Sequence, residues 1–261
     1  MSSPHTIGLV GFGRICRALY EYVEADPDFE LDYALVRSEK EGLPASKQVT
    51  DPAALADRPV DLVVEGATPE ALDELHEAML DSGDLMVLSG SAFADAGVQT
   101  RVERAASERD RAVYLPHAAL LGVDGLVDAR SELEAVSITA TKAPDHLDFS
   151  YTDAVSPEEV TGRTVLYEGP VRGLCKMFPR NFNSHAGVAL ASLGLDETTS
   201  KLVADPAAES ADHVIRASGE GFDLEITRKS AIEGVTGDYT LVSIWGSMRR
   251  VLGADEGLRF V

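Results

Sequence analysis

Two glycines near the N-terminus, Gly11 and Gly13, are spaced so that their backbone could hold a phosphate. They follow the apolar residues 6–10 and precede an amphipathic helical pattern over residues 14–25. In such a turn the first glycine permits the tight bend, the second lets backbone approach a pyrophosphate, and the helix N-terminus attracts the anion. Cys16 stands at the third position of this fingerprint, and a small thiol there only loosens the helix–strand packing. The pattern predicts a dinucleotide site; a tight turn without a ligand is the alternative.

The residues after the second predicted strand indicate which dinucleotide is bound. NAD-specific sites place an Asp or Glu here to hold the ribose hydroxyls. Residues 31–36 instead end at Arg37 and Ser38, and a guanidinium with a hydroxyl suits a 2′-phosphate. We therefore expect NADP or NAD as cofactor, with NADP preferred, and Arg14 as a second candidate phosphate contact. The alternative for Arg37 is a solvated loop residue.

The first half of the chain alternates short apolar runs with helical patterns. The expected strands are residues 6–10, 31–36, 61–65, 85–88 and 112–115, and the expected helices are residues 14–25, 69–80 and 98–107. Thr68 is a plausible N-cap for the second helix, with Pro69 at its first position. This alternation is typical of right-handed βαβ units on a parallel sheet, so we expect an α/β fold with an N-terminal doubly wound Rossmann domain.

After about residue 118 the rhythm changes. Strands are expected at residues 133–141, 164–167, 201–204, 213–218 and 222–227, with helices at residues 171–177 and 185–193. Residues 219–221 read as a hairpin turn, and residues 239–252 as a last helix returning to the first domain. The prediction is a Rossmann domain of residues 1–118 and 236–261, and an α+β substrate and oligomerisation domain of residues 119–235 with a largely antiparallel sheet.

Several short motifs occur in order along nearly the whole chain. The stretch 114–122 ends the last N-terminal strand, residues 178–183 read Phe-Pro-Arg-Asn-Phe-Asn, and Ala204-Asp205-Pro206 leads to Asp212 and His213. Together with residues 11–15, Glu-Gly-Ala-Thr-Pro-Glu-Ala at 65–71 and Tyr-Glu-Gly-Pro at 167–170, these resemble the L-aspartate dehydrogenase family. The resemblance is strongest at Phe-Pro-Arg-Asn-x-Asn and at Ala-Asp-Pro followed by His.

The resemblance implies an NAD(P)-dependent enzyme that oxidises the amine carbon of L-aspartate to iminosuccinate, which water converts to oxaloacetate and ammonia. It implies that His213 is the catalytic histidine, Ala119 a backbone contact to the nicotinamide and Asn183 its side-chain partner. Ile15 and Ala67, in the matching motifs, join the expected cofactor-binding residues. The family fold also returns its final helix to the dinucleotide domain.

The chemistry of the residues agrees with that role for His213. Hydride transfer from a carbon that bears an ammonium requires loss of a proton from the amine, and histidine is the natural acceptor near neutral pH. Asp205 and Asp212 are near enough in sequence to orient the imidazole or raise its pKa. The alternative is a structural histidine held by hydrogen bonds.

The chain departs from the family pattern at the expected substrate pocket. Pro-Ser-Gly-Ala is replaced by Pro-His-Ala-Ala at 116–119, and His185 occupies a position that is usually small and apolar. The Asn-Pro-Lys-Thr-Ser run is replaced by residues 234–240, which lack the lysine. His117 and His185 either line an altered pocket or make local hydrogen bonds. The cationic candidates for a dicarboxylate are Lys142, Arg172, Lys176 and Arg180.

Composition narrows the class of protein. A formal net charge of −21, with only six lysines, argues against nucleic-acid and membrane partners. Such a surface suits molar salt, so we expect a halophilic host and unfolding when salt is removed. The N-terminus has no signal-peptide pattern, and two distant cysteines indicate free thiols, so a cytoplasmic protein is expected. The histidine spacing predicts no metal site. An open sheet commonly pairs with another subunit, so a homodimer or homotetramer is expected.

Two other functions remain open from the sequence. An NAD(P)-dependent dehydrogenase or imine reductase acting on another amino, imino or hydroxy acid would use the same residues. A dinucleotide-sensing protein without catalysis would need no base, and the presence of Asn183 with His213 argues against it.

Overall fold

The computed structural model describes residues 3–230 and 238–253, which form two compact units. Unit 1 comprises the chain up to Ser89, Gly97–Ala118 and the chain from Leu241, and unit 2 comprises Gly90–Ala96 and Ala119–Thr240. The boundary expected between residues 235 and 236 lies outside the described residues, as does most of the run 234–240. Each unit is described separately below.

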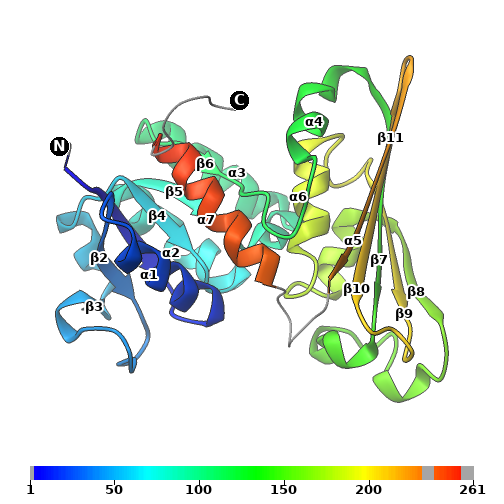
Figure 1. The fold of residues 1–261 in the computed structure, drawn as a ribbon, viewed down its shortest axis with the longest axis horizontal. Helices are drawn as coiled ribbons and strands as arrows, with labels where there is room; N and C mark the ends of the chain where they lie inside the picture. Colours follow the sequence, from blue (N-terminus) through cyan, green and yellow to red (C-terminus); the bar gives the residue numbers. More distant parts are fainter. Residues whose placement is uncertain (1–2, 231–237, 254–261) are drawn as a thin grey trace. The chain divides into compact units, whose positions relative to one another are not determined.

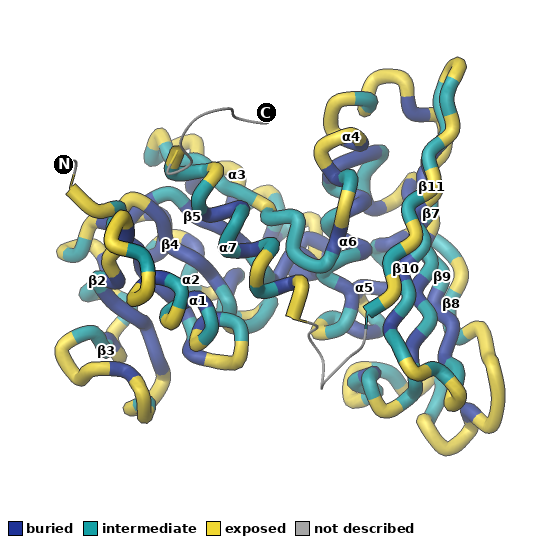
Figure 2. Tube along the Cα trace, viewed as in Figure 1, coloured by how far each residue is buried: buried dark blue, intermediate teal, exposed yellow. Residues whose placement is uncertain are grey.

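Unit 1 is built on a six-stranded parallel sheet with the order β3-β2-β1-β4-β5-β6 (Figure 1). Its strands are β1 (His5–Val10), β2 (Phe29–Leu35), β3 (Gln48–Val49), β4 (Leu62–Glu65), β5 (Asp84–Val87) and β6 (Val113–Tyr114). This is the strand order of a Rossmann domain, in which ligands bind at the carboxyl ends of the strands. The central strands are buried along their length, as Figure 2 shows, because helices cover both faces. The predicted Rossmann fold is therefore confirmed.

Four helices accompany this sheet: α1 (Arg14–Ala25), α2 (Pro69–Ser82), α3 (Ala96–Glu108) and α7 (Asp238–Leu252). The first turn of α2 is capped as the sequence predicts, since Thr68 Oγ1 accepts a hydrogen bond from the Ala71 amide at 3.2 Å. Pro69 occupies its first position, where a missing N–H costs nothing.

The last helix, α7, returns to the first unit as predicted. Ile244 and Met248 are buried in the same apolar cluster as Leu19 of α1. The Trp245 ring lies 4.7 Å from the Phe29 ring, measured between centroids, and Arg249 pairs with Asp26. These contacts attach α7 to the start of β2 and the end of α1.

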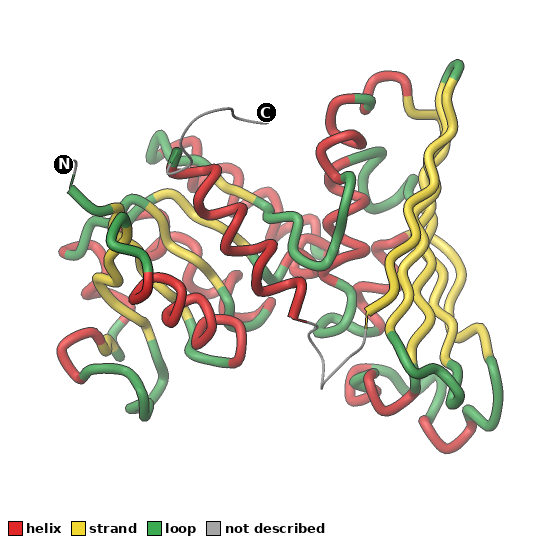
Figure 3. Tube along the Cα trace, in the orientation of Figure 1, coloured by secondary structure: helices red, strands yellow, loops and turns green. Residues whose placement is uncertain are grey.

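Unit 2 is built on a five-stranded sheet with the order β11-β10-β7-β9-β8. The strands are drawn in yellow in Figure 3. Its strands are β7 (Leu133–Lys142), β8 (Thr164–Pro170), β9 (Thr199–Ala204), β10 (Ala211–Gly219) and β11 (Phe222–Ser230), and its helices are α4 (Val123–Asp128), α5 (Val171–Met177) and α6 (Asn183–Ala191). Only β7 and β9 pair in parallel, so the largely antiparallel sheet is confirmed. Gly221, at φ +83°, completes the predicted hairpin turn between β10 and β11.

Short elements were missed by the sequence prediction. These are β3, α4 and the 3₁₀ helices at Ala45–Lys47, Pro52–Asp57, Gly90–Ala94, Arg130–Glu132, Pro144–His146, Phe149–Tyr151 and Pro157–Glu159. A two-residue strand and helices of three to six residues are too short for their hydrophobic period to be read. Within the described ranges, no helix is long and apolar enough to cross a membrane.

Candidate active site

The glycine turn of unit 1 has the geometry of a pyrophosphate cradle. Gly11 has φ +90°, and a Cβ there would lie 3.0 Å from the carbonyl oxygen of Gly66, so a side chain is excluded twice. Gly13 is the N-cap of α1; no side chain caps this end, and a Cβ on Gly13 would meet nothing within 4 Å. The open backbone and the uncapped helix start fit an anion. Arg14 and Ile15 follow as the first residues of the helix, Arg14 exposed and Ile15 half-buried.

Cys16 packs the turn and is no reactive thiol. Its Sγ is fully buried, 3.9 Å from the carbonyl oxygens of Val10 and Gly66, and burial raises its pKa to about 12. A Cβ on Gly66 would lie 2.5 Å from this sulfur. The missing third glycine of the fingerprint is thus offset by a glycine on the neighbouring loop.

A buried carboxylate that sequence reasoning missed orders the adjacent loop. Glu65 ends β4, is fully buried, and accepts hydrogen bonds from the Ala67 amide at 2.8 Å, the Ser89 amide at 3.0 Å and Ser89 Oγ at 2.9 Å. Burial raises its pKa and these donors counteract the shift. Ala67, an expected cofactor contact, is exposed on the loop that Glu65 holds. The only sequence signal was a Glu closing an apolar strand.

Arg37 and Ser38 lie exposed just beyond the carboxyl end of β2, next to the end of β1 where the glycine turn begins. The loop that follows is anchored by Gln48, whose Oε1 accepts from the Lys40 amide at 2.9 Å and whose Nε2 donates to the carbonyls of Lys40 and Leu43. Lys40 Nζ lies 3.5 Å from Ser38 Oγ. The predicted cofactor residues of unit 1 therefore share one edge of its sheet, and three cationic or hydroxyl groups gather at its β2 end.

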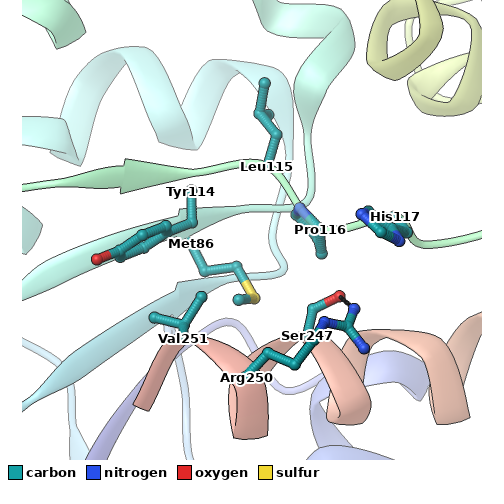
Figure 4. A pocket seen from close by; sticks show the side chains of 8 residues that line it. All are labelled: Met86, Tyr114, Leu115, Pro116, His117, Ser247, Arg250 and Val251. Atoms are coloured by element: carbon teal, nitrogen blue, oxygen red, sulfur yellow. Dashed lines mark hydrogen bonds between the residues drawn. The ribbon is translucent and has the colours of Figure 1, made fainter. Parts of the chain in front are cut away.

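His117 lines a pocket of unit 1 rather than joining the other histidines. The pocket lies between the ends of β5 and β6 and helix α7, as Figure 4 shows, and its lining residues are Met86, Tyr114, Leu115, Pro116, His117, Ser247, Arg250 and Val251. Arg250 Nη2 donates to Ser247 Oγ at 3.1 Å across its floor. This pocket lies within unit 1, so a role of His117 in the expected substrate pocket stays a prediction.

The two asparagines of the motif Phe-Pro-Arg-Asn-Phe-Asn, Asn181 and Asn183, make different contacts in unit 2. Asn181 ties the neighbouring loop, since its Oδ1 accepts from the Asp148 amide and its Nδ2 donates to the His146 carbonyl. Asn183, the first residue of α6, is oriented by the Ser91 amide, which donates to its Oδ1 at 3.0 Å. Ala119 is half-buried near the start of the main segment of unit 2.

His213 lies at the buried face of the second sheet, on β10, next to the start of α6. Its side chain is 5% exposed, its Nε2 lies 3.5 Å from Ser184 Oγ, and its Nδ1 has no hydrogen-bond partner among the described residues. The contact with Ser184 brings His213 close to Asn183, as the sequence expectation requires. The imidazole is thus buried, with one nitrogen close to Ser184 and the other without a partner among the described residues.

His185 makes a local hydrogen bond beside this site. It is fully buried, its Nδ1 lies 2.6 Å from Ser200 Oγ, and its ring packs edge-on to Phe182 and to His213, at centroid distances of 4.8 and 6.1 Å. Burial is the main cause that lowers its pKa well below the usual value, so the ring is neutral.

Two cations share the face and the sheet end of His213. Lys142 closes β7, is 5% exposed, and donates to the Asn181 carbonyl at 3.4 Å from a position 5.1 Å from the centre of the Phe182 ring. Arg228 on β11 is the cross-strand partner of His213. Burial and the Arg228 charge lower the pKa of Lys142 to about 8; burial, Lys142 and Arg228 lower that of His213 to about 3.

The other polar candidates of the sequence lie elsewhere. Asp212 faces away from His213, 3.7 Å from Lys229, because successive residues of a strand point to opposite faces. Asp205 pairs with Arg163, and Arg172 with Asp196. The prediction that Asp205 or Asp212 orients the imidazole was therefore wrong. Arg180 lies 3.8 Å from Asp148, Lys176 is exposed, and no His/Cys/Asp/Glu group that could hold a metal ion occurs among the described residues.

Comparison with known proteins agrees with both units. The model of the C-terminal domain of aspartate dehydrogenase matches residues 124–251, and that of the NAD-binding domain of homoserine dehydrogenase matches residues 11–116. The L-aspartate dehydrogenase of Ralstonia pickettii is 32% identical over 85% of this chain and 88% of its own length. That of Nitrosopumilus maritimus is 34% identical over 64% of this chain, and the match spans 62% of that relative.

A solved structure extends the similarity to the whole fold. The crystal structure of aspartate dehydrogenase from Thermotoga maritima has a TM-score of 0.78 and 26% identity, covering 98% of this chain and 99% of that one. The two domain models match successive parts of the chain in the order of the two units, and the Ralstonia relative and the Thermotoga structure each cover most of it. The chain belongs to the aspartate dehydrogenase family.

Proposed function

We propose that this chain oxidises the amine carbon of L-aspartate to iminosuccinate, which water converts to oxaloacetate and ammonia, or catalyses the reverse reduction. As a member of its family it is an amino-acid dehydrogenase that uses NAD or NADP. The observation that carries the choice of substrate is the cluster of Lys142, His213 and Arg228: a neutral base between two cations suits an amine flanked by carboxylates.

The residues of unit 1 fit a dinucleotide. The open backbone of Gly13 and the uncapped start of α1 would hold its pyrophosphate, and Glu65 keeps the Ala67 loop in place beside them. The bound nicotinamide supplies the hydride acceptor. By the family resemblance, Asn183, whose Oδ1 is fixed by Ser91, would contact its carboxamide, and Ala119 would contribute a backbone group.

In the proposed reaction His213 acts as the general base. Its neutral imidazole accepts a proton from the substrate ammonium, so that the amine lone pair can form the C=N bond as the hydride leaves Cα. Water then adds to the imine carbon, and ammonia departs. Burial keeps bulk water from the imidazole before substrate binds.

The substrate is tested with a panel of acids. Reduction of NADP and NAD would be followed with L-aspartate, L-glutamate, L-alanine and L-malate in molar salt. A kcat/KM for aspartate well above every other acid is expected. Higher activity with another acid would replace aspartate in the proposal, and cofactor binding without turnover of any acid would exclude an enzyme of this kind.

For the cofactor we predict that Arg37→Ala raises the KM for NADP about 10-fold and leaves that for NAD unchanged. The arginine offers charge-assisted hydrogen bonds that only a 2′-phosphate accepts. Steady-state kinetics with both cofactors measures this. Arg104→Ala is the control, because Arg104 is an exposed arginine of α3. If the wild type has the same kcat/KM with NAD as with NADP and Arg37→Ala has no effect, Arg37 is a solvated loop residue that does not bind the cofactor.

We further propose a homodimer or homotetramer in the cytoplasm. Strand β8 is an edge of the second sheet, and Val165 on it is half exposed, which suits pairing with another subunit. Both cysteines are free and buried, as in reducing compartments. Sedimentation in molar salt gives the subunit number, and a monomer at micromolar concentration would contradict the assembly.

A further inference from the structure

Three basic side chains occupy one face and one end of the second sheet. Strands β11, β10 and β7 are adjacent in that order, Arg228 pairs with His213 across β11 and β10, and His213 pairs with Ala140 across β10 and β7. Lys142 is two residues beyond Ala140, so it lies on the same face. The cluster of Lys142, His213 and Arg228 is therefore fixed by strand register.

No carboxylate balances this cluster within the described part of the chain. Neither Lys142 nor Arg228 has an acidic partner within 4 Å there, and Arg228 has only the Tyr239 ring, 5.2 Å from its guanidinium carbon. The effects that lower the pKa values of Lys142 and His213 are burial and neighbouring positive charge alone. The chain has 44 acidic and 23 basic residues, so a group of basic side chains without an acidic partner is not expected from its composition.

Grouped like charges destabilise the fold where they are buried, as Lys142 and His213 are, while Arg228 is half-buried. An ammonium removed from water costs several kcal/mol unless an anion or hydrogen bonds compensate it, and like charges across strands repel. An anionic ligand would supply that compensation. The start of α6 adds to the attraction, since no side chain caps it and its Ser184 contacts His213.

We propose that Lys142 and Arg228 bind the two carboxylates of the substrate on either side of His213, and that Arg228 restricts the enzyme to dicarboxylic amino acids. This proposal rests on the proposed function. Adjacent strands lie about 4.8 Å apart, so β7 and β11 lie about 10 Å apart with β10 between them. The side chains of Lys142 and Arg228 therefore lie on either side of His213. In a four-carbon dicarboxylic amino acid, the carbon that bears the amine likewise lies between two carboxylates.

Substitution of Arg228 tests the proposal. L-asparagine is the neutral analogue of L-aspartate, so a residue that binds the second carboxylate should favour aspartate over asparagine. Arg228→Gln is expected to lower kcat/KM for L-aspartate about 30- to 100-fold, mostly through KM, because one charged hydrogen-bond partner of the substrate is lost. Activity with L-asparagine is expected to stay or rise, so the aspartate-to-asparagine ratio collapses. Arg228→Lys should restore part of that ratio. Arg216→Gln is the matched control, since Arg216 is an exposed arginine of the same hairpin paired with Glu225.

A binding measurement separates this proposal from the proposed function. Calorimetric titration with succinate is expected to show binding to the wild type and to Arg216→Gln, with at least 10-fold weaker binding to Arg228→Gln; thermal melts verify that each variant is folded. Aspartate turnover with an unchanged ratio in Arg228→Gln would overturn the subsite and leave the function standing. Succinate binding that depends on Arg228, in a protein that does not oxidise aspartate, would overturn the function alone. Inorganic phosphate binding as tightly as succinate would overturn the dicarboxylate assignment.

Discussion

Replacement of His213 by asparagine is expected to lower kcat for aspartate oxidation by at least about 100-fold and to leave the Kd for NADP unchanged. The asparagine side chain can keep the contact with Ser184 Oγ, which lies 3.5 Å from His213 Nε2, but it accepts no proton near neutral pH. Cofactor affinity is unaffected because the pyrophosphate cradle belongs to unit 1. Steady-state kinetics and a fluorescence titration with NADPH measure the two quantities.

The control for this variant is His146→Asn, which removes another histidine of unit 2, outside the Lys142–His213–Arg228 cluster, and should leave kcat within about twofold. Unchanged turnover in His213→Asn would remove this histidine from the mechanism. A parallel loss of NADP affinity would instead indicate that the substitution disturbs the fold.

The pH dependence of the wild type gives a second signature of His213. In the free enzyme its pKa is about 3, so it is neutral and gives no acid limb in kcat/KM above that pH. Lys142 and Arg228 are the charged groups that face it, and His185 beside it is neutral. Burial is the main cause of the low pKa of His213 and the two cations add to it, so a bound dicarboxylate that offsets both cations would raise that pKa. The acid limb of kcat, which reports the enzyme–substrate complex, is therefore expected at higher pH than the His213 limb of kcat/KM.

The sequence was sufficient to predict the structure wherever that structure follows from a local rule. Gly11 needs positive φ, Thr68 caps a helix, and the alternation of strands and helices leaves few topologies. The site was harder because its polar members stand at strand ends. The predicted strands stopped at residues 141 and 227, one residue short of Lys142 and Arg228.

Lys142 was among the cationic candidates and Arg228 was missed, although the alternation of each strand indicates the face on which both residues lie. Val136, Ile138 and Ala140 share a face of β7, and Lys142 continues it; Leu224 and Ile226 share a face of β11, and Arg228 continues it. A cation in phase with the apolar positions of a strand lies on the same face as they do, and here Lys142 is buried and Arg228 half-buried. The same alternation turns Asp212 away from His213, its neighbour on the strand. No comparable rule reveals that Gly66 makes room for Cys16, because that contact joins segments distant in sequence.

Substitution of Lys142 by methionine is expected to stabilise the protein while removing most of its activity. At pH 7 the lysine is charged in the folded and unfolded chains, but its pKa falls from 10.5 to about 8 on folding. That difference corresponds to about 3 kcal/mol of destabilisation. Loss of the Phe182 and Asn181 contacts offsets about 1 kcal/mol, so a net gain of about 2 kcal/mol in the free energy of unfolding is expected.

The gain should depend on pH in a defined direction. Between pH 8 and pH 10.5 the unfolded lysine binds a proton that the folded lysine has lost, so wild-type stability rises with pH. The advantage of Lys142→Met is therefore constant below pH 8 and shrinks through that window. Denaturant unfolding at constant salt measures it, with Lys201→Met as control, because Lys201 is partly exposed and paired with Glu168 at 2.8 Å.

The same substitution is expected to lower activity. If Lys142 binds a substrate carboxylate, kcat/KM for aspartate should fall about 100-fold in Lys142→Met, and succinate should stabilise the wild type far more than the variant. A variant that is more stable and fully active would show that Lys142 has no role in binding. A variant that is less stable would show that an anion or a hydrogen-bond network already compensates the charge. A stability gain together with lost activity would mean that the fold retains this buried cation for the ligand that neutralises it.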